Sequence, residues 1–248
     1  MKTISIICQK GGVGKTTTVV NVAKIFSTLG YKTLIIDLDP QGNVSTYLNY
    51  DKNPEKDSNA IDLLEKKNDI VPGKISNNLD ILSSNIKISK FNEEKIVGGS
   101  KLQHAFNMNK LDCYDLIIID TPPTMSSLVQ EALAVSDFYL IPAKPEFLAV
   151  EGVAQAMNFA KESIKSIQNT NPLFLGVVTE LEYLLAEKLL TTKISQTAEI
   201  ADGPFYAKTV VDFKEDSKSR NEYFDLANEI LRKVGLHEEI TELPDNRY

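Results

Sequence analysis

The residues best able to do chemistry form one glycine-rich loop near the N-terminus. This loop reads Lys-Gly-Gly-Val-Gly-Lys-Thr-Thr over residues 10–17 and directly follows an apolar run at residues 4–8. Between a buried strand and a helix, such a loop cradles phosphates, because its backbone N–H groups and the helix dipole favour an anion. We expect Lys15 to reach the β- and γ-phosphates of a nucleotide and the Thr16 hydroxyl to bind Mg²⁺. The expected cofactor-binding residues of the loop are Gly11, Gly12, Val13, Gly14, Lys15, Thr16 and Thr17.

The loop departs from the common phosphate-binding pattern G-x-x-x-x-G-K-[ST]. Gln9 occupies the position of the first glycine, and a second lysine, Lys10, stands five residues before Lys15. From the residues alone, Lys10 is either a solvated side chain at the mouth of the loop or a second cation for the phosphates.

Two further apolar runs end in acidic residues. One leads into Asp37 and Asp39, and the other, at residues 116–119, leads into Asp120. Runs of this length are typical of strands that are buried on both faces of a parallel sheet. Because the carboxyl ends of parallel strands form the ligand crevice, we expect these acids to lie beside the glycine-rich loop.

The elements that must position these residues alternate along the chain as apolar strand-like runs and amphipathic helical stretches, which is typical of βαβ units. We predict a single α/β domain over 1–248, with a doubly wound, mostly parallel sheet flanked by helices and a frayed tail at 238–248. Strands are expected near 3–8, 32–38, 79–83, 115–120, 138–142, 173–179 and 208–213. Helices are expected near 15–29, 60–67, 100–111, 126–135, 151–168, 183–190 and 221–234.

Composition excludes several classes of protein. A net charge of −7 argues against a chain that coats nucleic acid over its whole surface. The sequence has no apolar run of 18 residues and begins in a strand-like run, so we expect neither a membrane span nor a signal peptide. Cys8 and Cys113 lack the spacing of metal ligands. We therefore expect a reduced, cytoplasmic protein that does not bind membranes.

The three motifs, in this order, resemble the ParA/MinD family of P-loop ATPases with a deviant Walker A loop, and the resemblance extends from residue 3 to about 235. It implies an ATPase whose cofactors are ATP and Mg²⁺. Asp39 matches the acid that orients or deprotonates the attacking water. Asp37 is the second candidate for that role, or a structural acid that bonds the N-terminus of a helix. Asp120 matches the Walker B acid, so the expected metal site comprises Thr16, Asp39 and Asp120.

The resemblance also implies a dimer that closes around ATP. Lys10 would reach the nucleotide of the partner subunit, which makes Lys10, Lys15 and Asp39 the expected catalytic residues. The segment around Pro142 and Pro145 is similar to the one that packs over adenine, although a strand exit turned by prolines explains these residues equally well.

Within the family, the chain is most similar to the short ParA type. Its C-terminal end is acidic and contains Pro244, unlike the basic membrane helix of MinD-like proteins, and no helix-turn-helix segment precedes the first predicted strand. The cysteines do not suit the shared cluster of nitrogenase-reductase-like relatives. The implied function is DNA partition by a nucleoid-associated ATPase that a ParB-like centromere-binding protein stimulates.

The expected surface for non-specific DNA departs from the family pattern. Residues 186–220 hold six basic and six acidic residues, and Ser195 stands where relatives often have an arginine. The remaining candidates are Lys214, Lys218 and Arg220. Two alternatives stay open: an orphan ATPase that positions a cargo other than DNA, and a metabolic P-loop ligase or synthetase of the same fold.

Overall fold

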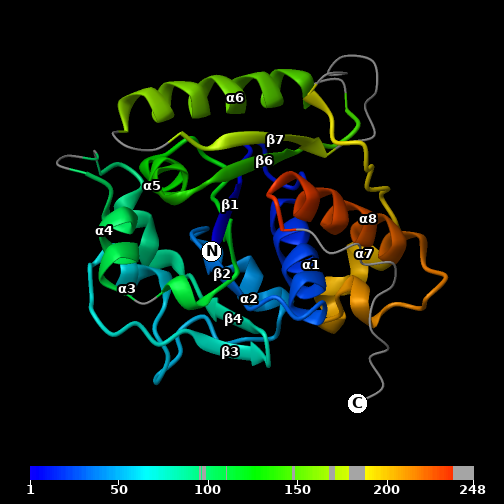
Figure 1. Cartoon of the computed structure of the whole chain (residues 1–248), viewed down its shortest axis with the longest axis horizontal. Coiled ribbons are helices and arrows are strands. Elements are labelled where there is room, and N and C mark those ends of the chain that lie inside the picture. The colour runs from blue at the N-terminus through cyan, green and yellow to red at the C-terminus, as the bar shows by residue number, and fades with distance from the viewer. Residues whose placement is uncertain are drawn as a thin grey trace.

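A seven-stranded sheet forms the centre of the computed structural model, with strand order β3-β4-β2-β5-β1-β6-β7 (Figure 1). The structure describes residues 1–94, 96, 99–109, 111–146, 149–167, 171–178 and 188–236. All neighbouring strands are parallel except the edge strand β3, which is antiparallel to β4. The strands are β1 (Lys2–Ile6), β2 (Thr33–Asp37), β3 (Gly73–Ser76), β4 (Leu79–Leu82), β5 (Leu116–Asp120), β6 (Phe138–Pro142) and β7 (Leu173–Val178).

The central strands are apolar along their length because both of their faces are covered. Ile35 packs against one helical layer, whereas its neighbours Leu34 and Ile36 pack against the other. The first layer contains α1 (Lys15–Thr28) and α8 (Lys218–Lys233), which lie side by side (Figure 1). The second contains α3 (Ala60–Leu64), α4 (Lys101–Met108), α5 (Ser127–Val135) and α6 (Ala149–Ser166). This confirms the predicted doubly wound α/β class.

Strand register brings the predicted chemistry to one edge of the sheet. Ile6, the last residue of β1, pairs with Asp120 of β5, and Asp37 of β2 pairs with Asp120 from the other side. The glycine-rich loop follows β1 directly and leads into α1. The three motifs therefore meet at the carboxyl ends of adjacent strands, as parallel topology requires.

One predicted strand is wrong. Residues 208–213 do not join the sheet, because Val210–Asp212 forms a short 3-10 helix whose capping box pairs Thr209 with Asp212. The backbone N–H of Val210 donates instead to Asn21 Oδ1 of α1 at 2.8 Å. Valine-rich sequence favours a strand, but this long-range bond and the cap satisfy the backbone differently.

The structure also corrects two smaller expectations. In the predicted helix at 183–190, residues 183–187 lie outside the described residues, and Leu189 forms a bridge with Val177 instead of a helical turn. The strand β3 and the short helices α2 (Asn43–Tyr47) and α7 (Ala198–Asp202) were not predicted, since segments of four or five residues carry little periodicity. The tail at 238–248 lies outside the described residues. No described helix has both the length and the apolar character needed to cross a bilayer.

Candidate nucleotide site

The loop between β1 and α1 is shaped by two glycines in the left-handed region. Gly12 has φ 69° and Gly14 has φ 94°, conformations that cost little only without a side chain. The loop curls around Lys15, which is 7% exposed and whose Nζ lies 3.3 Å from the carbonyl oxygen of Lys10. The ammonium group of Lys15 is thereby held at the mouth of α1, where a phosphate would meet the helix N-terminus.

A pocket of about 570 Å³ opens above this loop. It is lined by every residue that the sequence assigned to cofactor binding, including Pro142 and Pro145 on the opposite rim, and by Asp39. The size lies within the range of small-ligand and cofactor sites. The glycine-rich backbone lines one part of the pocket, and the apolar side chains Pro142, Val178 and Ile194 line another, which suits a molecule with a charged tail and a flat apolar base.

Asp120 and Thr16 form the polar pair at the bottom of the site. The Thr16 hydroxyl donates to Asp120 Oδ2 at 2.6 Å. Asp120 is fully buried, and its other oxygen, Oδ1, has no hydrogen-bond partner within the described part of the chain. The pKa of Asp120 is raised to about 7, mainly by burial and also by the neighbouring Asp39 carboxylate, while the Thr16 bond and Lys15 oppose the rise.

An unpartnered buried carboxylate oxygen beside a second carboxylate and a hydroxyl suits a hard divalent cation. Mg²⁺ typically takes one or two protein oxygens and completes its shell with phosphate and water. The described residues contain no cluster of three or more His, Cys, Asp or Glu that could hold a metal alone. The arrangement therefore fits Mg²⁺ that arrives with a nucleotide, rather than a metal held by protein ligands alone.

Asp37 and Asp39 have separate tasks in the structure. Asp37 is fully buried and accepts hydrogen bonds from the backbone N–H of Asp39 at 2.9 Å and of Val44 at 3.3 Å. Burial first, and then the nearby Asp120, raise the pKa of Asp37. Asp39 instead faces the pocket and accepts from the N–H of Gln41 at 2.9 Å. These contacts favour a structural role for Asp37, which accepts a hydrogen bond from the first turn of α2. Asp39 is the acid whose side chain faces the pocket.

Lys10 lies outside the pocket lining and forms an ion pair with Glu146, in the segment that follows β6. The Lys10 side chain is 38% exposed, and its charge lowers the pKa of the Glu146 carboxyl. The structure therefore places this lysine at the rim of its own pocket, between the glycine-rich loop and the Pro142–Pro145 segment.

One wall of the pocket was missed by the sequence reasoning. Residues 194–197 line this wall. The sequence marks Ser195 only as the position where relatives often have an arginine that binds DNA. Residues 191–197 form neither helix nor strand, and no local pattern marks them as pocket residues. Their place depends on hydrogen bonds to α8, which sequence periodicity does not reveal.

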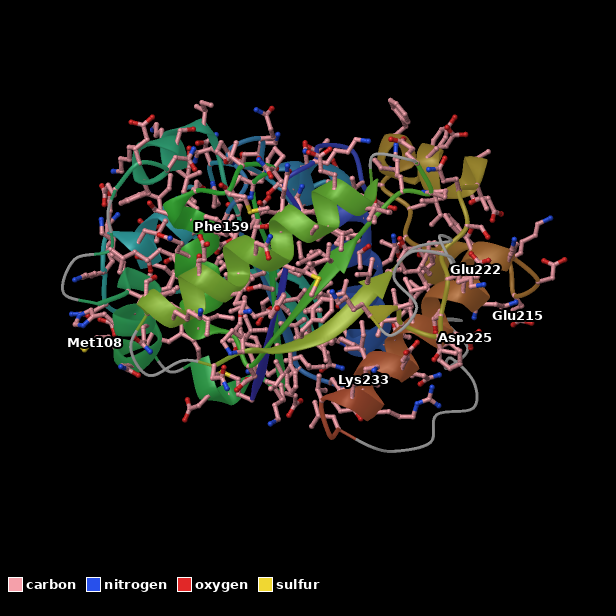
Figure 2. All side chains as sticks on the ribbon, turned by 90° about the horizontal axis from the view of Figure 1, so that it is seen from above. Met108, Phe159, Glu215, Glu222, Asp225 and Lys233 are labelled. Carbon is pink, nitrogen blue, oxygen red and sulfur yellow. The ribbon has the colours of Figure 1, made fainter. Side chains whose placement is uncertain are left out.

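The candidate DNA residues gather at the beginning of α8, each in a different setting. Lys214 is exposed and precedes Glu215 and Asp216, whereas the Lys218 Nζ lies 3.5 Å from Glu222 Oε1. The guanidinium of Arg220 donates to the carbonyl oxygen of Phe213 at 3.1 Å, so it also holds the loop. Figure 2 shows Glu215 and Glu222 in this same region. The structure thus brings the three residues together, but among acidic side chains.

The fold and this pocket define a P-loop nucleotide-binding ATPase. A family model described as an AAA domain matches residues 1–173. Among curated proteins, the sporulation initiation inhibitor protein Soj of Bacillus subtilis is 30% identical, covering 92% of this chain and 98% of its own length. The chromosome-partitioning ATPase Soj of Thermus thermophilus is 27% identical over 94% of this chain and 97% of its own. The chain belongs to the ParA/Soj family of P-loop ATPases. Its cofactors are ATP and Mg²⁺, in line with the ligands of the similar solved structures.

Solved structures share the fold. Apo McdA of Cyanothece superposes with a TM-score of 0.77 at 21% identity, covering 92% of this chain and 99% of its own. A putative plasmid partition protein of Borrelia burgdorferi bound to AMPPNP gives 0.74 at 24% identity, covering 94% and 98%. A cobyrinic acid a,c-diamide synthase of Mycobacterium smegmatis with a bound ATP analogue and magnesium gives 0.71 at 25% identity, covering 97% and 98%.

Proposed function

We propose that this protein is a partition ATPase of the cytoplasm, which forms a dimer around ATP and in that form binds DNA without sequence preference. The observation that carries the proposal is the pocket lined by Lys15, Thr16 and Asp39 at one sheet edge, with Asp120 hydrogen-bonded to Thr16 and a second lysine at the rim. Names of relatives support the biological role, because the Thermus relative is a chromosome-partitioning ATPase and the Borrelia structure a putative plasmid partition protein.

The chemistry requires positioning and charge neutralisation more than covalent catalysis. Bound Mg²⁺ would neutralise the phosphates and polarise the bond to the terminal one. Lys15 and the glycine-rich backbone bind and orient the phosphates, while Thr16 and Asp120 would hold the cation. Asp39 orients the attacking water and accepts its proton.

Lys10 has to leave Glu146 before it can act in a partner's site. The ion pair is exposed at both ends, with side chains 38% and 50% accessible, so solvent screens the attraction and the pair is easily broken. If two subunits approached with their pockets facing, Lys10 could exchange Glu146 for the more highly charged phosphates of the partner's ATP. ATP would therefore favour the dimer because it supplies the negative charge that draws Lys10 across the interface.

DNA binding in this proposal depends on the dimer. The candidate contacts on one subunit are Lys214, Lys218 and Arg220, which lie among acidic neighbours. Two subunits double the phosphate contacts, and free energies that add multiply the binding constants. A ParB-like centromere-binding protein with a basic segment would then stimulate hydrolysis and release the dimer from the nucleoid.

The test is a gel-shift titration of ATP-bound protein with duplex DNA at low salt. Changing Lys214, Lys218 and Arg220 to glutamate is expected to abolish the shift while ATP-dependent dimerisation persists. The matched control changes the exposed Lys161 and Lys165 of α6 to glutamate and is expected to leave the shift nearly intact. A wild-type ATP dimer that binds no DNA fragment would contradict the proposal.

A second candidate function is the positioning of a cargo other than DNA. The acidic neighbours of Lys214 and the internal bond of Arg220 favour it, because they weaken the basic surface. It predicts ATP-dependent dimerisation without a DNA shift. A metabolic synthetase, as the name of the Mycobacterium structure suggests, predicts instead that a small acceptor stimulates ADP release without dimerisation.

A further inference from the structure

One carboxylate on α8 contacts both the nucleotide pocket wall and a candidate DNA residue. Glu222 Oε2 accepts from the backbone N–H of Ser195 at 2.7 Å, and Oε1 accepts from the Ser195 hydroxyl at 2.7 Å. The Lys218 ammonium lies 3.5 Å from that same Oε1, one helical turn earlier. Figure 2 shows Glu222 on α8, near Asp225 of the same helix.

The segment that Glu222 holds has little support of its own. Residues 191–197 have no regular secondary structure, and residues at three positions along α8 form hydrogen bonds with them. Glu229 accepts from the N–H groups of Thr191 and Thr192 at 2.9 and 2.8 Å, Glu222 binds Ser195, and the hydroxyls of Ser219 and Thr197 lie 2.6 Å apart. Glu222 also lies 3.5 Å from the ammonium of Lys218, a side chain that is 70% exposed and one of the candidate DNA residues.

We propose that Glu222 is a positioning residue that couples the nucleotide pocket to the basic surface through Ser195 and Lys218. While Lys218 pairs with Glu222, it draws negative charge away from the bonds to Ser195. When Lys218 binds a phosphate of another molecule, Glu222 becomes the stronger acceptor and holds the pocket wall more firmly. By linkage, nucleotide in the pocket then favours the release of Lys218 to that phosphate. The identity of the phosphate as DNA rests on the proposed function.

The positioning role is tested without DNA, by titrating a fluorescent non-hydrolysable ATP analogue. Glu222→Ala leaves the Ser195 N–H without its acceptor and is expected to weaken binding about tenfold. Glu222→Gln is expected to restore binding to within about threefold of wild type, because its amide oxygen accepts and its NH₂ donates to the same serine. Asp225→Asn removes a charge from an exposed position on the same helix and serves as the matched control.

The coupling is tested by a double-mutant cycle in the same assay. Lys218→Met is expected to strengthen analogue binding about twofold in the wild-type background and to have no such effect beside Glu222→Gln. Lys208→Met is the control, since this exposed lysine of the same C-terminal third shows no ion pair within the described residues. Equal effects of Lys218→Met in both backgrounds would overturn the coupling, as would wild-type affinity in a folded Glu222→Ala protein.

A DNA arm separates this inference from the proposed function. With the ATP analogue bound, Glu222→Gln is expected to bind duplex DNA about two- to fivefold more tightly than Asp225→Asn, because Lys218 is released. If the wild-type dimer and Asp225→Asn bind DNA but Glu222→Gln binds it no better, the inference fails while partition stands. If no protein binds DNA while the cycle is non-additive, the proposed function fails and the Ser195–Glu222–Lys218 coupling stands.

Discussion

Replacing Asp120 with asparagine is expected to stabilise the nucleotide-free protein at high pH while removing its response to magnesium and ATP. Asp120 is fully buried, and burial raises the pKa of its carboxyl to about 7. The folded protein thus keeps a proton that the unfolded chain loses near pH 4. Stability contributed by this group consequently falls as the pH rises from about 4 to 7 and stays low above that range.

The magnitude follows from the pKa. Raising the pKa of one carboxyl from 3.8 to about 7 corresponds to about 4 kcal/mol at most, at about 1.36 kcal/mol for each pH unit. Asparagine still accepts the Thr16 hydroxyl bond and carries no charge. The substitution also removes the negative charge of Asp120, which repels the Asp37 carboxylate and raises its pKa. The variant is therefore expected to exceed wild type by about 4 kcal/mol at pH 8 but by only about 1–2 kcal/mol at pH 5, where Asp120 still keeps its proton in the folded protein.

The assay is urea unfolding of both proteins without nucleotide at pH 5 and pH 8. Asp225→Asn, on the surface of α8, controls for a general effect of charge. A thermal melt with and without Mg²⁺ and ATP completes the test, because wild type gains stability from the ligand and Asp120→Asn is expected to gain much less. An asparagine variant that is less stable than wild type at pH 8, or equally shifted at both pH values, would refute the reasoning.

Three other variants test separate parts of the structure. Lys15→Ala removes the cation that the loop holds at the phosphate site, so calorimetry is expected to show no ATP binding; unchanged affinity would contradict the assignment. Asp39→Ala is expected to bind ATP but not to hydrolyse it, which size-exclusion chromatography would detect as a persistent dimer, whereas a normal turnover rate would transfer the role to another residue. Asn21→Ala leaves the buried N–H of Val210 unpaired and removes a bond to the Tyr47 hydroxyl, so urea unfolding is expected to show a loss of about 2–4 kcal/mol; a loss below about 0.5 kcal/mol would mean that water replaces these bonds.

The sequence by itself determined the sheet class and which motifs meet beside the glycine-rich loop. Apolar runs ending in Asp37, Asp39 and Asp120 predict buried parallel strands, and parallel topology requires their carboxyl ends to meet beside the loop that follows β1. The same reasoning placed Lys15 and Thr16 correctly in the pocket. These predictions succeed because short, contiguous patterns specify both the strand and the loop that follows it.

Only the tertiary structure decided which contacts Asp37 and Asp39 make, how residues 208–213 fold, and where Ser195 lies. Asp37 and Asp39 are two residues apart, and the sequence left open whether Asp37 is catalytic or structural; in the structure Asp37 bonds the first turn of α2 and Asp39 faces the pocket. The strand-like residues 208–213 became a 3-10 turn because Asn21, 189 positions away from Val210, takes its N–H. Ser195 joined the pocket wall because Glu222 binds it from α8. The last two outcomes depend on hydrogen bonds between segments far apart in the sequence, and no local pattern of residues encodes such bonds.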